Sequence, residues 1–357
     1  MTTPAPFERI GFRAPIRGVV FGTSTRAPAL PKRPFRPAVA VQRHLILAYR
    51  PKWQSIEDLN TVAAHVRDLD PRIATFLAPT THRNPITRKA AAKLPTLVVS
   101  PGRMVAFQPL RGKVYQGWPI PKVEEVRLLE AGGVPVPRTA VLTPDLRLDE
   151  ADWGEFVILK PTDIGTSSQG LGIQLIRTRR VHYIAPKDYP PGHPGQLGPM
   201  IVQEYIHTGE RVAICRVLTL FGEPLYILDT EAAGGRVDLT ASDEVIEATP
   251  IANQQFKEAV LRRFIDDQEA AAVARLAYRA LPGIPLQGVD VIRDARTGKL
   301  YVLETNAGGN TWHFSSSLQA ESRRKNGAEF ERQRRYQMDA LRTAARVLVA
   351  KTNSDAV

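Results

Sequence analysis

The 357-residue sequence has little of what would assign it to a class at once. Its only cysteine is Cys215, which excludes a disulfide within the chain and makes a reducing cytoplasm the simplest compartment. No apolar run reaches the roughly 18 residues that a membrane-spanning helix requires. Residues 1–18 also lack the apolar stretch of a secretory signal. We therefore expect a soluble, cytoplasmic globular protein with no membrane partner.

Several familiar catalytic and binding motifs are missing as well. The chain contains no G-x-x-x-x-G-K-[ST] loop, which argues against a P-loop NTPase. Gly170 and Gly172 lack the third glycine of a dinucleotide fingerprint and lead into a predicted strand, where that fingerprint requires a helix. There is no zinc-ligand spacing, no aromatic-interleaved RNA motif and no Ser-His-Asp spacing. We expect Cys215, within an apolar strand, to be a core residue with no catalytic role.

Positive charge is abundant but unevenly distributed. The net charge is +12, and residues 1–40 contribute half of this excess. The basic residues of this segment are Arg9, Arg13, Arg17, Arg26, Lys32, Arg33 and Arg36. Such an arm can bind nucleic acid or anionic lipid. Because no nucleic-acid motif accompanies it, the sequence favours a solvated Pro/Arg-rich arm.

The segment after the arm alternates strand and helix patterns. The predicted elements are a strand at 44–49, a helix at 56–69, a strand at 72–77, a helix at 85–93 and a strand at 96–99. Glu57 and Asp58 lie in the first turn of the first helix, where the helix dipole favours acids. This β-α-β-α-β order predicts a small, mostly parallel α/β unit.

The rest of the chain is predicted to consist of eight strands and three helices. Helices are predicted at 122–131, 267–281 and 328–351. Strands are predicted at 136–142, 156–160, 172–177, 200–206, 213–219, 225–229, 286–293 and 300–304. The resulting domain hypothesis is a basic arm at 1–40, an α/β domain at 41–120, a linker helix and lid at 121–206, and a C-terminal domain at 207–357.

The strongest local signal for chemistry is FVILKPTDIGTSSQGLGIQLI at 156–176. A strand ends at Lys160, and the loop after it is rich in glycine and hydroxyl side chains. The loop residues singled out are Gly165, Thr166, Ser167, Ser168, Gly170 and Gly172. Backbone N–H groups and hydroxyls of such a loop can close over phosphate oxygens, with Lys160 supplying a charge. An ordinary flexible hairpin loop is the alternative interpretation.

The second signal is LQGVDVIRDARTGKLYVLETNAGGN at 286–310. The turn at 295–298 predicts a hairpin that places Asp290 beside Glu304 and Asn306. Glu304 and Asn306 are two residues apart and share one face of their strand. Two carboxylates and an amide oxygen suit Mg²⁺. A salt-bridged hairpin without metal is the alternative.

The third signal is PMIVQEYIHTGERVAICRV at 199–217. An apolar strand runs into Gln203, Glu204 and Ile206, where exposed backbone N–H and C=O groups could bind the edge of an adenine. Glu210, after the turn at Gly209, could accept hydrogen bonds from ribose hydroxyls. A plain edge strand is the alternative interpretation.

These three blocks, together with PKVEEVRLLEAGGVPVPRT at 121–139, resemble the ATP-grasp superfamily over roughly residues 45–315. The pattern is similar to D-alanine–D-alanine ligases and ribosomal-protein glutamate ligases. This resemblance implies an α/β (α+β) fold in which an N-terminal parallel α/β unit accompanies a lid and a C-terminal domain. ATP would be gripped between two antiparallel sheets.

The resemblance also implies roles for individual residues. Lys122 and Lys160 would contact nucleotide phosphates beneath the 165–172 flap, and Arg236 would lie near the transferred phosphate. The remaining assignments are Gln203, Glu204 and Ile206 for adenine, Glu210 for ribose, and Asp290, Glu304 and Asn306 for magnesium. The segment GGNTWHFSS after "ETNA" departs from the serine-proline-glycine turn that is usual in the peptide ligases. Substrate identity therefore cannot be transferred, and the proline-rich loop 185–199 departs from the family pattern too.

The sequence thus predicts an ATP- and Mg²⁺-dependent ligase that joins a small-molecule or peptide carboxylate to an amine through an acyl phosphate. Trp312, His313 and Arg324 are acceptor-site candidates that could equally be packing residues, and a homodimer is compatible with this prediction. One alternative is an ATP-grasp phosphotransferase acting on a hydroxyl. The other is a nucleic-acid- or partner-binding protein with a regulatory nucleotide site.

Overall fold

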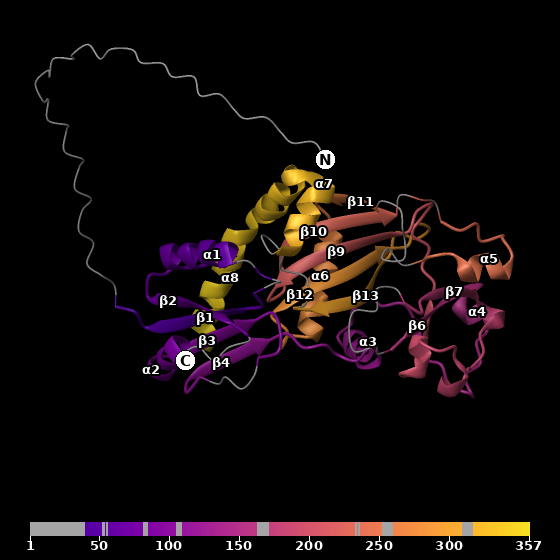
Figure 1. Ribbon diagram of the computed structural model, residues 1–357, viewed down its shortest axis with the longest axis horizontal. Helices are drawn as coiled ribbons and strands as arrows, with labels where there is room; N and C mark the ends of the chain where they lie inside the picture. The colour runs from indigo at the N-terminus through magenta and orange to yellow at the C-terminus, as the bar shows by residue number, and fades with distance from the viewer. Residues whose placement is uncertain are drawn as a thin grey trace, which may run out of the picture. The chain divides into compact units, whose positions relative to one another are not determined.

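In a computed structural model, the residues described are 40–51, 54, 56–80, 85–104, 109–162, 171–232, 234, 236–251, 260–308 and 317–357. Val39–Val357 form one compact unit. Its helices and strands belong to three sheets and the helices packed on them (Figure 1). No helix in the described part of the chain combines the length and apolarity needed to cross a bilayer.

The first sheet is parallel throughout, as the alternating pattern predicted. Its strands lie in the order β2-β1-β3-β4. In chain order the elements are β1 (Arg43–Tyr49), α1 (Ile56–Leu69), β2 (Ile73–Pro79), α2 (Pro85–Lys93), β3 (Thr96–Ser100) and β4 (Gly112–Gln116). Helix α1 buries Leu59, Val62 and Val66, which recur at helical spacing along one face. Strand β4 was not predicted.

The second sheet is small and antiparallel, and it carries Lys160. It contains β5 (Thr139–Val141), β6 (Phe156–Pro161), β7 (Gln174–Arg177) and β8 (Met200–Glu204), with α4 (Glu150–Trp153) between β5 and β6. The strand order is β5-β8-β6-β7, so β8 is an interior strand. This differs from the expectation that the 200–206 strand offers a free backbone, because β5 and β6 pair with it on both sides.

The third sheet is the largest and lies at the centre of the unit (Figure 1). Its order is β11-β10-β9-β12-β13, antiparallel throughout. The strands of this sheet and the helices near it in the chain are α3 (Lys122–Ala131), β9 (Ala213–Leu220), β10 (Glu223–Ala232), α5 (Asp243–Ala248), β11 (Val260–Phe264), α6 (Gln268–Ala280), β12 (Leu286–Arg293) and β13 (Leu300–Ala307). Val217, Val289 and Val302 cover one face of the sheet and pack against α6 and α3.

The C-terminal segment differs from the single helix predicted at 328–351. It forms α7 (Ser317–Tyr336) and α8 (Ala340–Asp355), separated by a 3-10 turn at Gln337–Asp339. The chain leaves helical geometry at Gly327, with φ of 83°, and at Met338, with φ of 53°. Helix α8 then packs against α1 and the first sheet, and Leu348 shares a buried cluster with Leu47 and Leu218. The last helix therefore begins after two residues with left-handed backbone, Met338 and Asp339, and packs its apolar face on both sheets.

Candidate active site

One face of the central sheet changes from apolar to charged along its strands. Leu220 and Leu218 of β9 are fully buried on this face, and the next residue on the same side is Arg216. Arg216 is directly opposite Asp290 of β12, which is directly opposite Glu304 of β13. Three charged side chains therefore form one row across three neighbouring strands. The position of Asp290 beside Glu304 is the one that the predicted hairpin requires.

Each carboxylate of this row is paired with a cation from another element. The Arg216 guanidinium donates two hydrogen bonds of 2.6 Å to the two carboxylate oxygens of Asp290. Lys122, at the start of α3, donates from Nζ to Oε2 of Glu304. Asp290 is 3% exposed, and burial raises its pKa against the opposing charge of Arg216. Burial also acts to raise the pKa of Glu304, but Lys122, Lys160 and Arg216 together lower it, and this pKa lies at about 2.

Asn306 connects the two carboxylates. Its Nδ2 donates to Oδ2 of Asp290 at 3.2 Å, to Oε1 of Glu304 at 3.5 Å and to the carbonyl of Gly288 at 3.3 Å. If a cation occupied the position that Nδ2 of Asn306 now faces, rotation of the amide group would turn its oxygen toward the cation. Within the described residues, no three His, Cys, Asp or Glu side chains gather. The set here, two carboxylates and one amide, fits a hard cation such as Mg²⁺.

Lys160 enters the site from the small sheet. It is 8% exposed, and its Nζ donates to Oε1 of Gln203 at 2.9 Å, while Nε2 of Gln203 donates to Oγ1 of Thr139 at 2.9 Å. Burial, together with the charge of Lys122, lowers the pKa of Lys160 to about 8. The charge of Glu304 acts in the opposite direction, which shows that Lys160 lies within electrostatic reach of the row.

Two residues of the cluster, Glu125 and Arg216, were missed at the sequence level. Glu125 of α3 is 5% exposed and accepts hydrogen bonds from the backbone N–H and the hydroxyl of Thr305. It fastens the helix that carries Lys122 to the strand that carries Glu304. The available signal for Arg216 was a basic residue in an otherwise apolar strand, in line with Leu218 and Leu220.

The region predicted to bind adenine, around Ile206, is apolar. The ladder of β8 ends at Glu204, whose backbone N–H donates to the carbonyl of Arg138 at 2.8 Å, so unpaired strand backbone can begin only after this residue. Ile206 is 6% exposed and packs with Ile292 and Leu303. Ile292 is two residues from Asp290 on β12, and therefore this apolar cluster borders the charged row. Neither Ile292 nor Leu303 was predicted as a site residue.

Glu210 and Arg236 lie together and contact neighbours outside the row. The carbonyl of Glu210 accepts from the backbone N–H of Arg236 at 2.9 Å, and the Glu210 side chain is exposed. The Arg236 guanidinium donates to Tyr205 Oη, to Thr208 Oγ1 at 2.6 Å and to the carbonyl of Gly209 at 2.9 Å. Among the described residues, no contact joins Arg236 to Lys122 or Glu304. Its predicted role near a transferred phosphate stays a prediction.

Some predicted site residues lie outside the described ones. These are Gly165, Thr166, Ser167, Ser168 and Gly170 of the flap, and Trp312 and His313 of the acceptor-site candidates. Gly172, at the end of the flap, has φ of 71°, which favours glycine. Arg324 is exposed. Cys215 of β9 has a pKa that burial raises to about 12, which keeps its thiol protonated at neutral pH and agrees with a packing role.

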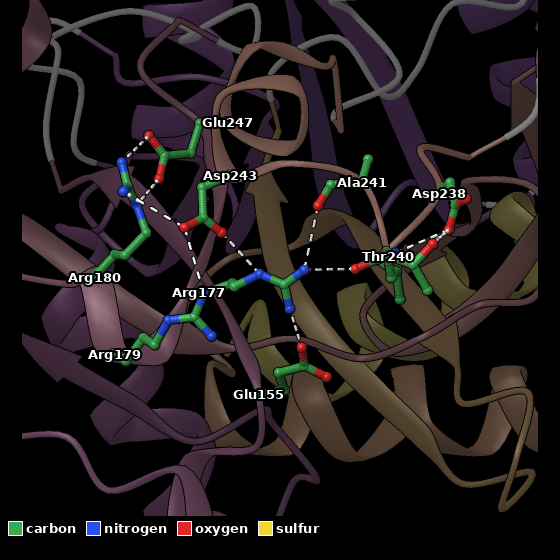
Figure 2. Close-up of polar contacts among 10 residues, drawn as sticks. Glu155, Arg177, Arg179, Arg180, Asp238, Thr240, Ala241, Asp243 and Glu247 are labelled. Carbon is green, nitrogen blue, oxygen red and sulfur yellow. Dashed lines mark hydrogen bonds and ion pairs between the residues drawn. The ribbon is translucent and has the colours of Figure 1, made fainter.

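A second ionic cluster fastens α5 to the small sheet, and Figure 2 shows its contacts. Arg177 of β7 donates to Asp243 Oδ1 at 2.8 Å, to the carbonyl of Leu239 at 2.9 Å and to Glu155. Its guanidinium also lies 4.7 Å from the ring centroid of Phe156. These contacts fasten the segment before and within α5 to the sheet that carries Lys160.

Comparisons with known proteins add a likeness of overall fold only. No protein-family model and no curated protein matches this chain. Among solved structures, the ATP-grasp ligase PsnB complexed with minimal precursor, Mg and ADP has a TM-score of 0.47 and 15% identity, covering 87% of this chain and 97% of that one. The D-cycloserine synthetase DcsG has a TM-score of 0.46 and 16% identity, covering 87% of this chain and 99% of that one.

D-alanine–D-alanine ligase from Bacillus anthracis complexed with ATP is also similar, with a TM-score of 0.39 and 14% identity over 88% of this chain and 99% of that one. Because all three TM-scores lie below 0.5, the chemistry of the site has to be inferred from this chain's own residues.

Proposed function

We propose that this protein is an ATP-grasp ligase that activates a carboxylate as an acyl phosphate and joins it to an amine. The observation that supports this most directly is the meeting of Lys122, Lys160 and Arg216 with the row of Asp290 and Glu304. These groups come from five different elements, and Lys122, Lys160 and Arg216 place three cations beside two carboxylates and the buried Glu125, whose own pKa burial raises. Such a site is suited to a polyanion held together with a divalent cation.

The roles follow from where each group lies. Asp290, Glu304 and Asn306 would hold Mg²⁺, which would neutralise charge on the phosphates when bound. Lys122 and Lys160 would stabilise the negative charge that develops on the transferred phosphoryl group. Binding of the triphosphate would exchange the present Lys122–Glu304 ion pair for contacts to phosphate. Ile206, with its neighbours Ile292 and Leu303, would support the adenine ring.

No protein nucleophile is required in this mechanism. A substrate carboxylate attacks the γ-phosphorus, ADP leaves, and the acyl phosphate is attacked by an amine that displaces inorganic phosphate. The protein contributes position and electrostatics, in agreement with a single cysteine whose thiol stays protonated. Small-molecule or peptide carboxylates and amines are the proposed substrates.

The test is ADP release by the full chain with Mg-ATP and pooled amino acids and small carboxylates. A ligase gives ADP, phosphate and a new amide, detected by mass spectrometry. If the product is a phosphorylated hydroxyl compound and no amide forms, the protein is a phosphotransferase and not a ligase. Failure of the wild-type chain to bind Mg-AMP-PNP would contradict both the ligase and the phosphotransferase. Salt-sensitive nucleic-acid binding that is lost when residues 1–40 are deleted would favour a binding protein.

A further inference from the structure

A group of arginines lies on the charged face of the central sheet, on the side away from the lysines. Arg262 of β11 is two residues from Phe264, which is directly opposite Leu228 of β10, and Leu228 is opposite Arg216 of β9. Residues in register, and residues two apart, share one face of a sheet. Arg262 therefore lies on the same face as Arg216 and Asp290.

Arg334 reaches this face from helix α7. Its guanidinium lies 5.8 Å from the ring centroid of Tyr226 and 5.6 Å from that of Phe330, and the residue is 7% exposed. Tyr226 shares a register row with Leu218, Gly288 and Asn306. Arg334 thus covers the same face that bears the proposed magnesium ligands.

The position of α7 against this face is fixed by Gln337. Its Oε1 accepts from the backbone N–H of Ile227 at 2.9 Å, and its Nε2 donates to the carbonyl of Ile265 at 2.6 Å. The rings of Phe264 and Phe330 add a contact with centroids 4.9 Å apart. Figure 1 shows the end of α7 beside β10 and β11. Arg334 is consequently held by the fold.

Arg262 differs from its neighbour Arg263 in having no carboxylate partner. Arg263 points to the opposite face and pairs with Asp229 at 2.7 Å and Glu231 at 2.5 Å. Arg262 is exposed and makes no hydrogen bond or ion pair with any residue that the structure describes. Partial burial of its guanidinium, and then the like charges of Arg334 and Arg216, lower its pKa.

We propose that Arg262 and Arg334 form a subsite that binds a carboxylate of the substrate. This inference rests on the proposed function, because it assigns the substrate side of the same site. Guanidinium groups recognise carboxylates through paired N–H donors, and no residue that the structure describes engages the donors of Arg262. Arg262 lies three strands from Asp290, on the order of 14 Å at about 4.8 Å per strand, so the subsite is beyond the proposed phosphate position.

The bound carboxylate has two sources: the group that becomes phosphorylated, or a carboxylate of the amine substrate that does not react. Both require that the preferred substrate be an anion at this end of the sheet. Small dicarboxylates and amino acids are therefore the compounds with which to probe the subsite.

The test begins with full-length protein saturated with Mg-AMP-PNP, titrated calorimetrically with acetate, succinate, glutarate and L-glutamate. We expect saturable binding of at least one of them, weakened on the order of tenfold in Arg262→Gln, since one charged hydrogen-bonding partner is lost. Arg262→Lys should retain part of the affinity. Arg263→Gln is the matched control and should bind as the wild type does.

Three outcomes would contradict the proposal of a carboxylate subsite. One is the absence of saturable carboxylate binding to the nucleotide-loaded wild type. Another is equal affinity in the wild type and Arg262→Gln, and the third is an equal loss in Arg263→Gln. Because nucleotide binding is measured first, a failure of the subsite leaves the proposed function intact, whereas a wild type that does not bind Mg-AMP-PNP contradicts the proposed function itself.

The two sources of the carboxylate are separated by steady-state kinetics with the substrate pair found by amide detection. If Arg262→Gln raises the KM of the carboxylate substrate alone, the subsite holds the group to be phosphorylated. If it raises the KM of the amine substrate alone, the subsite holds the acceptor's own carboxylate. An unchanged KM for both substrates, or a raised KM for ATP alone, would contradict the subsite.

Discussion

Two ionic clusters of similar size differ in charge balance. The cluster that fastens α5 to β7 sets three arginines against three acids: Arg177, Arg179, Arg180, Glu155, Asp243 and Glu247 (Figure 2). The cluster around the charged row sets three cations, Lys122, Lys160 and Arg216, against Asp290 and Glu304. Its third acid is Glu125, whose negative charge is disfavoured because burial raises its pKa. Arg262, which has no hydrogen bond or ion pair with the residues that the structure describes, adds a further positive charge to that face.

This difference in charge balance indicates that the α5 cluster is structural, whereas the cluster around the charged row binds an anionic ligand. A balanced set of ion pairs satisfies itself and can only hold elements together. An excess of guanidinium and ammonium groups in a partly buried place is unfavourable until an anion arrives. The central-sheet cluster therefore depends on what binds it, and the α5 cluster depends on the fold alone.

The largest effect that would sharpen this contrast is loss of turnover in Glu304→Ala. Removing one proposed magnesium ligand should lower kcat by about a thousandfold, equivalent to ~4 kcal/mol of transition-state stabilisation. The measurement is ADP release with the native substrates. Because the variant leaves Lys122 without its ion-pair partner, circular dichroism first establishes that the variant is folded. Glu247→Ala, in the other cluster, is the control, and turnover near the wild-type rate in Glu304→Ala would refute the metal assignment.

Next in size is the destabilisation expected for Arg177→Ala. The Arg177 side chain is 11% exposed, and its removal leaves Asp243, 19% exposed, without its best partner and the Leu239 carbonyl without a donor. Breaking such a buried pair should cost about 3 kcal/mol of unfolding free energy. Urea denaturation measures this value. A loss of less than about 1 kcal/mol would mean that the network does not hold α5 in solution.

A smaller effect concerns pH. Lys160, with a pKa lowered to about 8, is charged below that pH and neutral above it. Since a polyanion binds the charged form better, Mg-ADP affinity should be constant below pH 8 and fall up to about tenfold per unit above it. Calorimetry between pH 6 and 10 tests this. Lys160→Met should bind weakly throughout and show no step near pH 8, and a wild-type affinity that rises with pH would be inconsistent with the predicted contact.

The smallest effect is expected for Arg179→Ala. Arg179 is 58% exposed and lies 3.4 Å from Asp243, an atom pair that water screens well. Its loss should change the unfolding free energy by less than about 0.5 kcal/mol. The same urea series that includes Arg177→Ala provides the comparison. Equal losses in the two variants would show that charge count, and not burial, sets the strength of this cluster.

Much of the local structure was predictable because its periodicity is strong. The helices α1, α2 and α3 and the strand β12 were predicted with the bounds that the structure has. The pairing of Asp290 with Glu304 followed from one hairpin turn. Contacts between elements distant in the chain were not predictable, and the ion pair of Arg216 with Asp290, 74 residues apart, is one example.

By itself, the sequence determined which segments become strands and helices and which side chains share a face, because side-chain direction repeats every 2 or 3.6 residues. Only the tertiary structure decided that β8 is an interior strand, that the last helix begins at Ala340, and that Lys122 pairs with Glu304 while Lys160 lies within electrostatic reach of it. Burial and pairing between distant elements depend on the packing of whole sheets, and no local pattern carries that information.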